Sequence, residues 1–442
     1  MSSYETYKPS GIDWIGKVPT HWQLKRIKDV SLKILGGGTP DTGNEDYWDW
    51  DKETGIPWVA IADITKSAVI TDTEKFITQK GLQNSSAQLI DEGKILYSIY
   101  ASLGKVAISG RKLATNQAIL SIYENPNRVN LNFLKYYLIN LEDIVAGAGS
   151  STTQNNISLE KLRTFKIAFP EILEQVYIAN YLDDQTPKID RLISNKKAQA
   201  EKLKELRQIE INYAVTKGLN PNAEMKDSGI EWLGKIPKHW EKRKIATNFQ
   251  IIGSGTTPDA GNEEYYDETG KYYFVNTGDL KDCEIYDCEK KITEEAFTKF
   301  TSLKLFPVNT LLIAMYGATI GKVGILKTEA TTNQACCALA NSYRFNIDYM
   351  FYFFIGIRED IIRLSYGGGQ PNISQDTIKQ LRIPCPPKDE QLQIVEHLQK
   401  RTTAIDQLIK NIETQIEKLQ ELRKIKIHEA VTGKVRTTDL ND

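Results

Sequence analysis

The sequence has few cysteines and histidines, and neither residue is spaced for a disulfide framework or a metal site. The five cysteines form no CxxC pair, and the four histidines belong to no HExxH or Cys/His pattern. Zinc sites and disulfide-rich secreted domains depend on such spacings. We therefore expect reduced thiols and no bound metal.

Long apolar runs and an excess of charge of either sign are also missing. No run reaches the roughly 18 to 20 apolar residues that span a bilayer, and the N-terminus lacks the pattern of a secretory signal. We therefore expect a cytoplasmic protein with no membrane contact. With 56 Lys and Arg against 57 Asp and Glu, the net charge is −1, which argues against a large basic surface that grips DNA unaided.

Catalytic motifs are absent as well. Residues 317–323 (GATIGKV) approach a phosphate-binding loop, but they are one residue short of the Walker spacing and end in Val where Ser or Thr must hold magnesium. Residues 385–388 (CPPK) resemble the DPPY tetrapeptide of adenine methyltransferases, yet they lack the residues that would bond and stack on a flipped base. No GxSxG elbow or glycine-rich S-adenosylmethionine loop is present. We expect no catalytic centre and no cofactor in this chain.

What the sequence does contain is an internal repeat. Residues 10–22 (SGIDWIGKVPTHW) return as 228–240 (SGIEWLGKIPKHW), and 39–49 (TPDTGNEDYWD) return as 257–267 (TPDAGNEEYYD), both at an offset of 218. A period this long excludes a solenoid, so each copy should be a domain plus an extension, and the two copies should be related by a pseudo-twofold axis. Shorter matches at offsets of 216 or 217 continue the repeat: 103–106 with 320–323, 115–118 with 332–335, 156–158 with 372–374, 174–175 with 390–391, and 214–216 with 430–432.

Each copy begins with the features of a compact α/β or α+β domain. Gly and Pro at 36–40 and 253–258 predict a loop. Residues 131–141 and 347–357 have the length and apolar spacing of helices, and short β-branched and aromatic runs predict strands. The expected strands are 95–100, 106–108 and 118–123 in the first copy, and 311–316, 323–326 and 335–339 in the second.

Each copy ends in a long charged tract without glycine, which predicts a helix with a narrow apolar stripe. Pro187 should break or kink the first tract, which leaves an upstream helix and a main helix from about Pro187 to Thr216, roughly 45 Å long at 1.5 Å per residue. The two stripes can bury each other as an antiparallel coiled coil; the alternative is that each tract packs only on its own domain. The stripes comprise Ile178, Leu182, Ile189, Leu192, Leu203, Leu206 and Tyr213, and Ile394, Leu398, Ile405, Leu408, Ile412, Leu419 and Leu422.

In this order and spacing, the repeated segments resemble the specificity subunit of type I restriction–modification enzymes. The resemblance covers essentially the whole chain and is strongest at 225–240 (MKDSGIEWLGKIPKHW); the loops at 36–40 and 256–258, the TNQ triplets at 115 and 332, and the QxNIS segments at 154 and 370 also fit. It implies target-recognition domains at 1–170 and 218–386, a central helical spacer at 171–217, a distal helical spacer at 387–434 and a tail at 435–442.

The resemblance also implies partners. Each recognition domain would read one half of an asymmetric, bipartite site in double-stranded DNA, with the helices acting as a ruler. Two methyltransferase subunits would dock on the helical region, and restriction (translocase) subunits would join them for cleavage. S-adenosylmethionine, ATP and magnesium would be held by those partners, which would also complete the clamp of a neutral chain around DNA.

We expect DNA contacts from polar, glycine-containing loops that recur in both copies, because hydroxyls, lysine and backbone amides suit phosphate, and side-chain amides read adenine. Shared residues cannot explain two different half-sites, so they are either phosphate anchors or scaffold turns. Base reading should lie where the copies differ, as at 75–88 and 290–302. The candidates are Thr39, Tyr100, Ser102, Lys105 and Gln154, and Thr257, Tyr316, Thr319, Lys322 and Gln370.

The repeated tryptophans Trp14, Trp22, Trp232 and Trp240 could stack on bases, but core anchoring is favoured because a duplex offers no unstacked base. Two other functions stay open. One is a coiled-coil adaptor or scaffold that does not read DNA, and the other is an enzyme of unrecognised type, such as a solitary methyltransferase.

Overall fold

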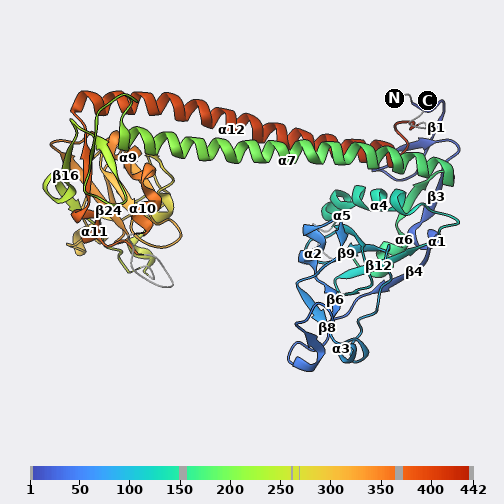
Figure 1. Ribbon diagram of the computed structural model, residues 1–442. Helices are drawn as coiled ribbons and strands as arrows, with labels where there is room; N and C mark the ends of the chain where they lie inside the picture. The colour runs from blue at the N-terminus through green and yellow to red at the C-terminus, as the bar shows by residue number, and fades with distance from the viewer. Residues whose placement is uncertain (1–2, 149–156, 260–261, 268, 364–371, 438–442) are drawn as a thin grey trace. The chain divides into compact units, whose positions relative to one another are not determined.

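The chain folds into two compact units, one made of residues 1–196 and 414–442 and the other of residues 197–413 (Figure 1). The computed structural model describes residues 3–148, 157–259, 262–267, 269–363 and 372–437. Each unit contains one copy of the globular repeat, the beginning of the long helix that follows that copy, and the end of the long helix that follows the other copy.

Both units are built around a five-stranded sheet with the same strand order. Neighbouring strands are antiparallel except at one edge, where the last strand in the order pairs parallel with its neighbour. The order is β4 (Ser31–Gly36), β12 (Ile119–Glu124), β9 (Ile95–Ser98), β10 (Val106–Ser109), β7 (Val69–Ile70) in the first unit, and β17 (Phe249–Gly253), β24 (Cys336–Ser342), β21 (Leu311–Ala314), β22 (Val323–Leu326), β19 (Cys283–Ile285) in the second.

Both faces of this sheet are buried, which explains the continuous apolar runs in the sequence. Ile95 and Tyr97 of β9 belong to the core that contains Phe133, whereas Leu96 between them belongs to a separate core on the opposite face. Successive side chains of a strand point to opposite faces.

The strands and helices predicted for the globular part are confirmed, with ends that shift by a few residues.

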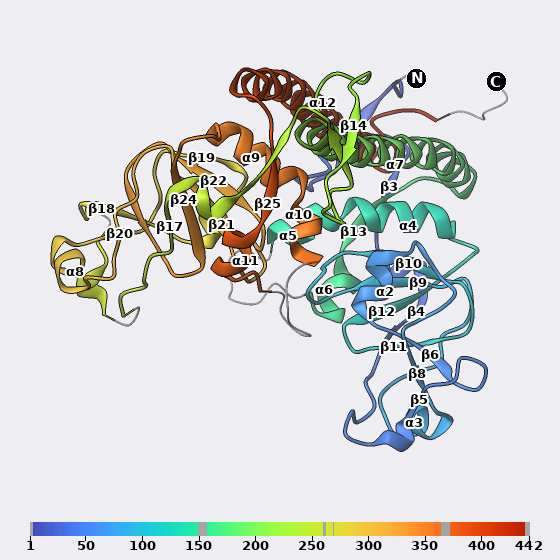
Figure 2. The ribbon, with the colours of Figure 1, turned by 60° about the vertical axis from the view of Figure 1, so that its left-hand side comes forward.

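A smaller sheet and one short helix form the end of each unit that lies away from the helix α4 (Leu131–Asn140) or α9 (Ile347–Gly356); we call this part the distal lobe (Figures 1 and 2). In the second lobe, a single bridge between Tyr266 and Ile292 replaces the edge strand that the first lobe forms at Trp48–Asp49. The first lobe contains β11 (Ala114–Thr115), β6 (Ile56–Val59), β8 (Lys75–Ile77), β5 (Trp48–Asp49) and α3 (Gln79–Gln83); the second contains β23 (Ala330–Thr332), β18 (Tyr272–Val275), β20 (Lys291–Ile292) and α8 (Glu294–Lys299).

Repeated capping residues start the helices that cover the large sheet. The Asn130 side chain accepts a hydrogen bond from the backbone N–H of Phe133 at the start of α4 (Leu131–Asn140), and Asn346 does the same for α9 (Ile347–Gly356). Ser158 and Ser374 cap α6 (Leu159–Thr164) and α11 (Gln375–Gln380).

The remaining elements of the globular copies form matching pairs, with the first-unit member given first. They are β1 (Tyr7–Pro9) and β14 (Met225–Asp227); β2 (Lys17–Pro19) and β15 (Lys235–Pro237); β3 (Gln23–Arg26) and β16 (Glu241–Lys244); α1 (Ile27–Val30) and the 3-10 helix η2 (Ile245–Thr247); η1 (Glu45–Tyr47) and η3 (Glu263–Tyr265); α2 (Ile61–Lys66) and η4 (Thr277–Asp279); α5 (Glu142–Ala148) and α10 (Arg358–Arg363); β13 (Lys166–Phe169) and β25 (Arg382–Cys385).

The predicted break at Pro187 is wrong, because α7 runs without interruption from Ile172 to Lys217. Proline lacks the N–H that would bond the carbonyl four residues earlier, so neighbouring contacts must hold this turn. The Thr186 hydroxyl donates to the carbonyl of Leu182 at 2.7 Å, and the hydroxyl of Tyr136 on α4 donates to the Asp183 carboxylate, also at 2.7 Å. Tertiary packing thus overrides the local preference.

Within each unit α7 and α12 (Lys388–Val431) run antiparallel, as predicted for a coiled coil. In the first unit Asp190 pairs with Arg423 at 2.8 Å, and in the second the equivalent Asp406 pairs with Arg207 at 2.9 Å. The alternative in which each tract packs only on its own domain is excluded, because each large core contains residues of both helices. They are Ile178, Ala179, Tyr181, Leu182, Ile427, Ala430 and Val431 in the first unit, and Ile211, Ala214, Val215, Ile394, Val395 and Leu398 in the second.

Part of the predicted stripe is wrong. The buried positions between the helices include Ile189, Ile193, Ile405, Ile409 and Ile412. The predicted stripe instead includes Leu192 and Leu408, which lie one position before Ile193 and Ile409. These leucines face solvent, because one residue turns the helix by about 100°. The exposed members of the predicted stripe are Leu192, Leu206, Tyr213, Leu408 and Leu422.

Candidate nucleic-acid interface

The loops that carry most of the candidate residues leave the large sheet at the same place in both units. The first joins β9 to β10 and contains Tyr100, Ser102 and Lys105; the second joins β21 to β22 and contains Tyr316, Thr319 and Lys322. Tyr100 is exposed, and the other five side chains are partly exposed. The backbone is left-handed at Ala101 and Gly104 in the first loop, and at Gly317 and Gly321 in the second.

The structure brings a second predicted segment to each loop. The N–H of Ile157 donates to the carbonyl of Ile99 at 3.2 Å, and the N–H of Ile373 donates to the carbonyl of Met315 at 2.8 Å. These residues belong to the QxNIS segments. Gln154 and Gln370 themselves lie outside the described residues.

Thr39 and Thr257 make equivalent side-chain hydrogen bonds, each within its own unit. The Thr39 hydroxyl hydrogen-bonds the side chain of Gln117, and the Thr257 hydroxyl hydrogen-bonds that of Gln334. Each bond ties the TPD loop to the TNQ triplet of the same unit. A Cβ on Gly37 would lie 2.0 Å from the Asn116 carbonyl oxygen, so glycine is required for this close approach. For these two threonines the geometry favours the scaffold-turn interpretation.

The segments where the copies diverge fall in the distal lobes. Residues 75–88 contain β8 and α3, and residues 290–302 contain β20 and α8. Trp50, which belongs to none of the motifs considered above, is 90% exposed in the first lobe. Its signal in the sequence is the longer turn after the aligned TPD segment, where 50–55 (WDKETG) stands against 268–270 (ETG).

Two further repeated residues, Glu174 and Glu390, join the start of each long helix to its globular copy. The Glu174 carboxylate contacts His21 Nε2 at 2.9 Å, and that of Glu390 contacts His239 Nε2 at 2.8 Å. The pairs could have been found from the sequence, because both the histidines and the glutamates recur at matching positions. They act on architecture, since they fix the helix beside the entry segment of the domain.

The interpretation of the repeated tryptophans as core anchors is confirmed. Trp22 and Trp240 have no exposed surface, and Trp14 and Trp232 pack against the same two cores while remaining partly exposed. The indole N–H of Trp22 donates to Glu174 at 3.0 Å.

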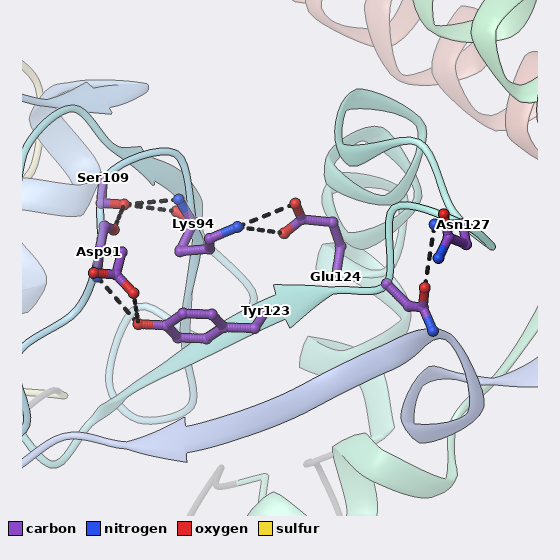
Figure 3. Close-up of polar contacts among 7 residues, drawn as sticks. Asp91, Lys94, Ser109, Tyr123, Glu124 and Asn127 are labelled. Carbon is purple, nitrogen blue, oxygen red and sulfur yellow. Dashed lines mark hydrogen bonds and ion pairs between the residues drawn. The ribbon is translucent and has the colours of Figure 1, made fainter.

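An ionisable cluster lies at the end of the first large sheet where β9 begins and β10 and β12 end. Figure 3 shows Lys94 reaching Glu124, with Nζ–Oε distances of 3.1 and 3.2 Å, beside Tyr123. The Tyr123 hydroxyl donates to the Asp91 carboxylate at 3.3 Å, and burial raises the tyrosine pKa. These contacts join the ends of β9, β10 and β12 and stabilise the fold.

The described residues contain no group of three or more His, Cys, Asp or Glu side chains placed to hold a metal ion. Burial raises the pKa of the Cys337 thiol to about 12, and it raises that of Cys336 as well, so neither supplies a thiolate at neutral pH. None of the helices in the described ranges is both long and apolar enough to cross a membrane.

Comparison with known proteins identifies the repeated unit. The family model of the type I restriction modification DNA specificity domain matches the chain twice, at residues 19–202 and 237–418. The chain belongs to this family. The MjaIX specificity subunit of a type I restriction enzyme from Methanocaldococcus jannaschii is 25% identical over 435 residues, which are 96% of each chain. The Escherichia coli EcoR124I/EcoR124II specificity subunit is 27% identical over 203 residues, covering 44% of this chain and 46% of that one.

Solved structures of this family have the same fold. A chain from a study of complex assembly and conformational transition of the type I R-M system superposes with a TM-score of 0.74 at 15% identity, over 95% of this chain and 99% of that one. The HsdS subunit from Thermoanaerobacter tengcongensis superposes with a TM-score of 0.51 at 14% identity, over 95% and 98% of the two chains.

Proposed function

We propose that this chain is the DNA-specificity subunit of a type I restriction–modification complex and reads a bipartite, asymmetric site with one half-site per unit. The recognition domains are residues 1–170 and 218–386, the helical spacers are 171–217 and 387–434, and the tail is 435–442. The observation that carries the proposal is one scaffold built twice with distal lobes that differ, which is what reading two different half-sites requires.

The long helices offer a repeated surface for a partner that binds twice. We call it the helix patch: Leu192, Leu422 and Ile425 in the first unit, and Leu408, Leu206 and Ile209 in the second. The members correspond at an offset of 216, and Leu192 and Leu408 are 50% and 51% exposed. In each unit the patch adjoins the equivalent ion pair, Asp190–Arg423 or Asp406–Arg207. Exposed apolar groups at matching places suit two identical partners.

These partners are two methyltransferase subunits, joined by restriction (translocase) subunits for cleavage. In this proposal the partners carry the S-adenosylmethionine, ATP and magnesium chemistry, and the chain itself is a non-catalytic protein of the cytoplasm. DNA contact falls to the loops with Tyr100, Ser102 and Lys105, and with Tyr316, Thr319 and Lys322, and to Gln154 and Gln370. Thr39 and Thr257 contribute by shaping their loops.

Detection of methylated adenines across the genome of a host that expresses this chain with its partners tests the proposal. We expect one bipartite motif with a fixed gap of unspecified bases. The competing adaptor function predicts methylation that does not change when the specificity chain is exchanged. A solitary methyltransferase predicts that the isolated chain binds S-adenosylmethionine in a calorimetric titration, which our proposal contradicts.

A further inference from the structure

The two loops that carry a candidate phosphate-binding lysine differ in charge. In the first unit, Lys105 Nζ lies 2.6 Å from Glu142 Oε1 at the start of α5. In the second unit, α10 begins instead with Arg358, which donates through Nε to the carbonyl of Gly321 at 3.0 Å and through Nη2 to Asp282. Among the described residues, Lys322 has no ion-pair partner.

The residues at these two places are structurally equivalent. A Cβ on Gly104 would lie 2.9 Å from Cα of Glu142, and a Cβ on Gly321 would lie 2.9 Å from Cγ of Arg358, so the loop glycine meets the first residue of the helix in both units. Both glycines have positive φ angles, which fix the same turn. The charge on the helix residue is therefore reversed within one conserved geometry.

The acid that pairs with Arg358 is also specific to the second unit. The equivalent residues Ile108 and Ile325 pair with Val69 and Glu284, respectively. Two residues before Val69 lies Ser67, and two residues before Glu284 lies Asp282, so the first unit has a serine where the second has this acid. The first group, Ser67, Lys105 and Glu142, has no net charge. The second group, Asp282, Lys322 and Arg358, has a net charge of +1.

We infer that the second unit makes a phosphate contact through Lys322 that the first unit lacks, because Glu142 neutralises Lys105. The two half-sites are therefore held with unequal electrostatic strength. Phosphate approaching the first loop also meets the Glu142 carboxylate, which repels it at the distance where Lys105 would attract it. The inference rests on the proposed function and changes one part of it, because Lys322 of the second loop contacts a DNA phosphate and Lys105 of the first loop does not.

The salt dependence of DNA binding by the complex assembled with its methyltransferase partner tests this. Each phosphate neutralised contributes about −0.9 to the slope of log Kobs against log salt concentration. We expect Lys322→Ala to make the slope shallower by about 0.9 and Lys105→Ala to leave it unchanged. Glu142→Gln should make it steeper by about 0.9, because it frees Lys105. Lys238→Ala, which removes an exposed lysine paired with Glu224, controls for net charge.

Equal effects of Lys105→Ala and Lys322→Ala, or an unchanged slope in Glu142→Gln, would overturn the inference. Failure of the proposed function looks different, because the wild-type complex would then show no preference for its target over other duplexes. Phosphate-ethylation interference adds an independent readout: Lys322→Ala should remove interference in one half-site only. Thermal unfolding of each variant excludes loss of fold as the cause.

Discussion

Gln175 and Gln391 make the same three hydrogen bonds at equivalent places in the two units. Each accepts from the backbone N–H before a capped helix, that of Asn130 or Asn346, at 2.8 Å. Each donates through Nε2 to two carbonyls, those of Arg128 and Pro170 or of Arg344 and Pro386. Both side chains are fully buried at the junction between globular copy and long helix.

Replacing this glutamine should destabilise its unit strongly. Gln175→Ala leaves one N–H and two carbonyls without partners, which costs about 3 kcal/mol, and Gln391→Ala should cost the same. Gln185→Ala is the matched control, because among the described residues that side chain hydrogen-bonds only the neighbouring Asp184. Calorimetric unfolding measures all three variants. Equal stability of Gln175→Ala and Gln185→Ala would contradict the junction role.

The buried seam and the exposed leucines should respond differently to truncation. Ile193→Ala removes a side chain from the seam and should cost roughly 2–4 kcal/mol, whereas Leu192→Ala next to it should change stability by less than about 0.5 kcal/mol. Urea unfolding of the two variants gives the comparison. A larger loss for Leu192→Ala would restore the stripe predicted from the sequence.

Acidification should weaken the first unit through His428. Burial lowers the pKa of this imidazole, whose Nδ1 contacts the Asn140 side chain at 3.2 Å. The unfolded chain takes up the proton near pH 6.5 and the folded chain only at lower pH, so stability falls as the pH drops below about 6.5. Unfolding midpoints measured between about pH 5 and 7.5 should depend less on pH in His428→Gln. Parallel curves for the two proteins would refute the assignment.

Charge placed on the helix patch should remove one partner at a time. Ile209→Glu and Ile425→Glu alter equivalent exposed positions, so each single variant should bind one methyltransferase subunit and the double variant none. Both should fold normally, since neither side chain is buried. Native mass spectrometry counts the bound subunits. Leu32→Glu, at an exposed residue of β4, is the control and should still bind two methyltransferase subunits.

Substitution in the first distal lobe should change only one half of the target site. Gln83 and Gln88 are exposed within the divergent segment 75–88, and amides read adenine edges. In a host carrying Gln83→Ala or Gln88→Ala, methylome sequencing should return altered bases in one half-site, with the other half-site and the gap unchanged. A change in both half-sites would argue against one half-site per unit.

The doubled architecture was predictable because the two copies still share recognisable segments of sequence. The repeats of 10–22 and 39–49, together with the apolar runs that form β9 and β21, are sufficient to predict the fold class. The continuity of α7 through Pro187 was not predictable, since the hydrogen bond that supports this turn comes from Tyr136 of another helix to Asp183. The seam could not be assigned for a similar reason: leucine and isoleucine are equally apolar, and only the partner helix decides which is buried.

The candidate site was predictable only as a set of loops. Repetition pointed to Lys105 and Lys322 alike. In the first unit, however, the charge beside the lysine is set by Glu142, which lies 37 positions further along the chain. In the second unit it is set by the pair of Arg358 and Asp282. The same repetition flagged Thr39 and Thr257, whose hydroxyls the structure occupies with glutamine partners. Sequence periodicity locates a loop, but partners distant along the chain decide what each side chain can do.

Ile427, Ala430 and Val431 complete the first core, and Lys434 Nζ donates to the carbonyl of Ile15 at 2.7 Å. During translation these residues leave the ribosome after the whole of the second unit. The second unit, by contrast, is a contiguous stretch that is available as soon as residue 413 has emerged. The unit that is synthesised first is therefore completed last, and a chain that stops before residue 427 lacks part of its first core.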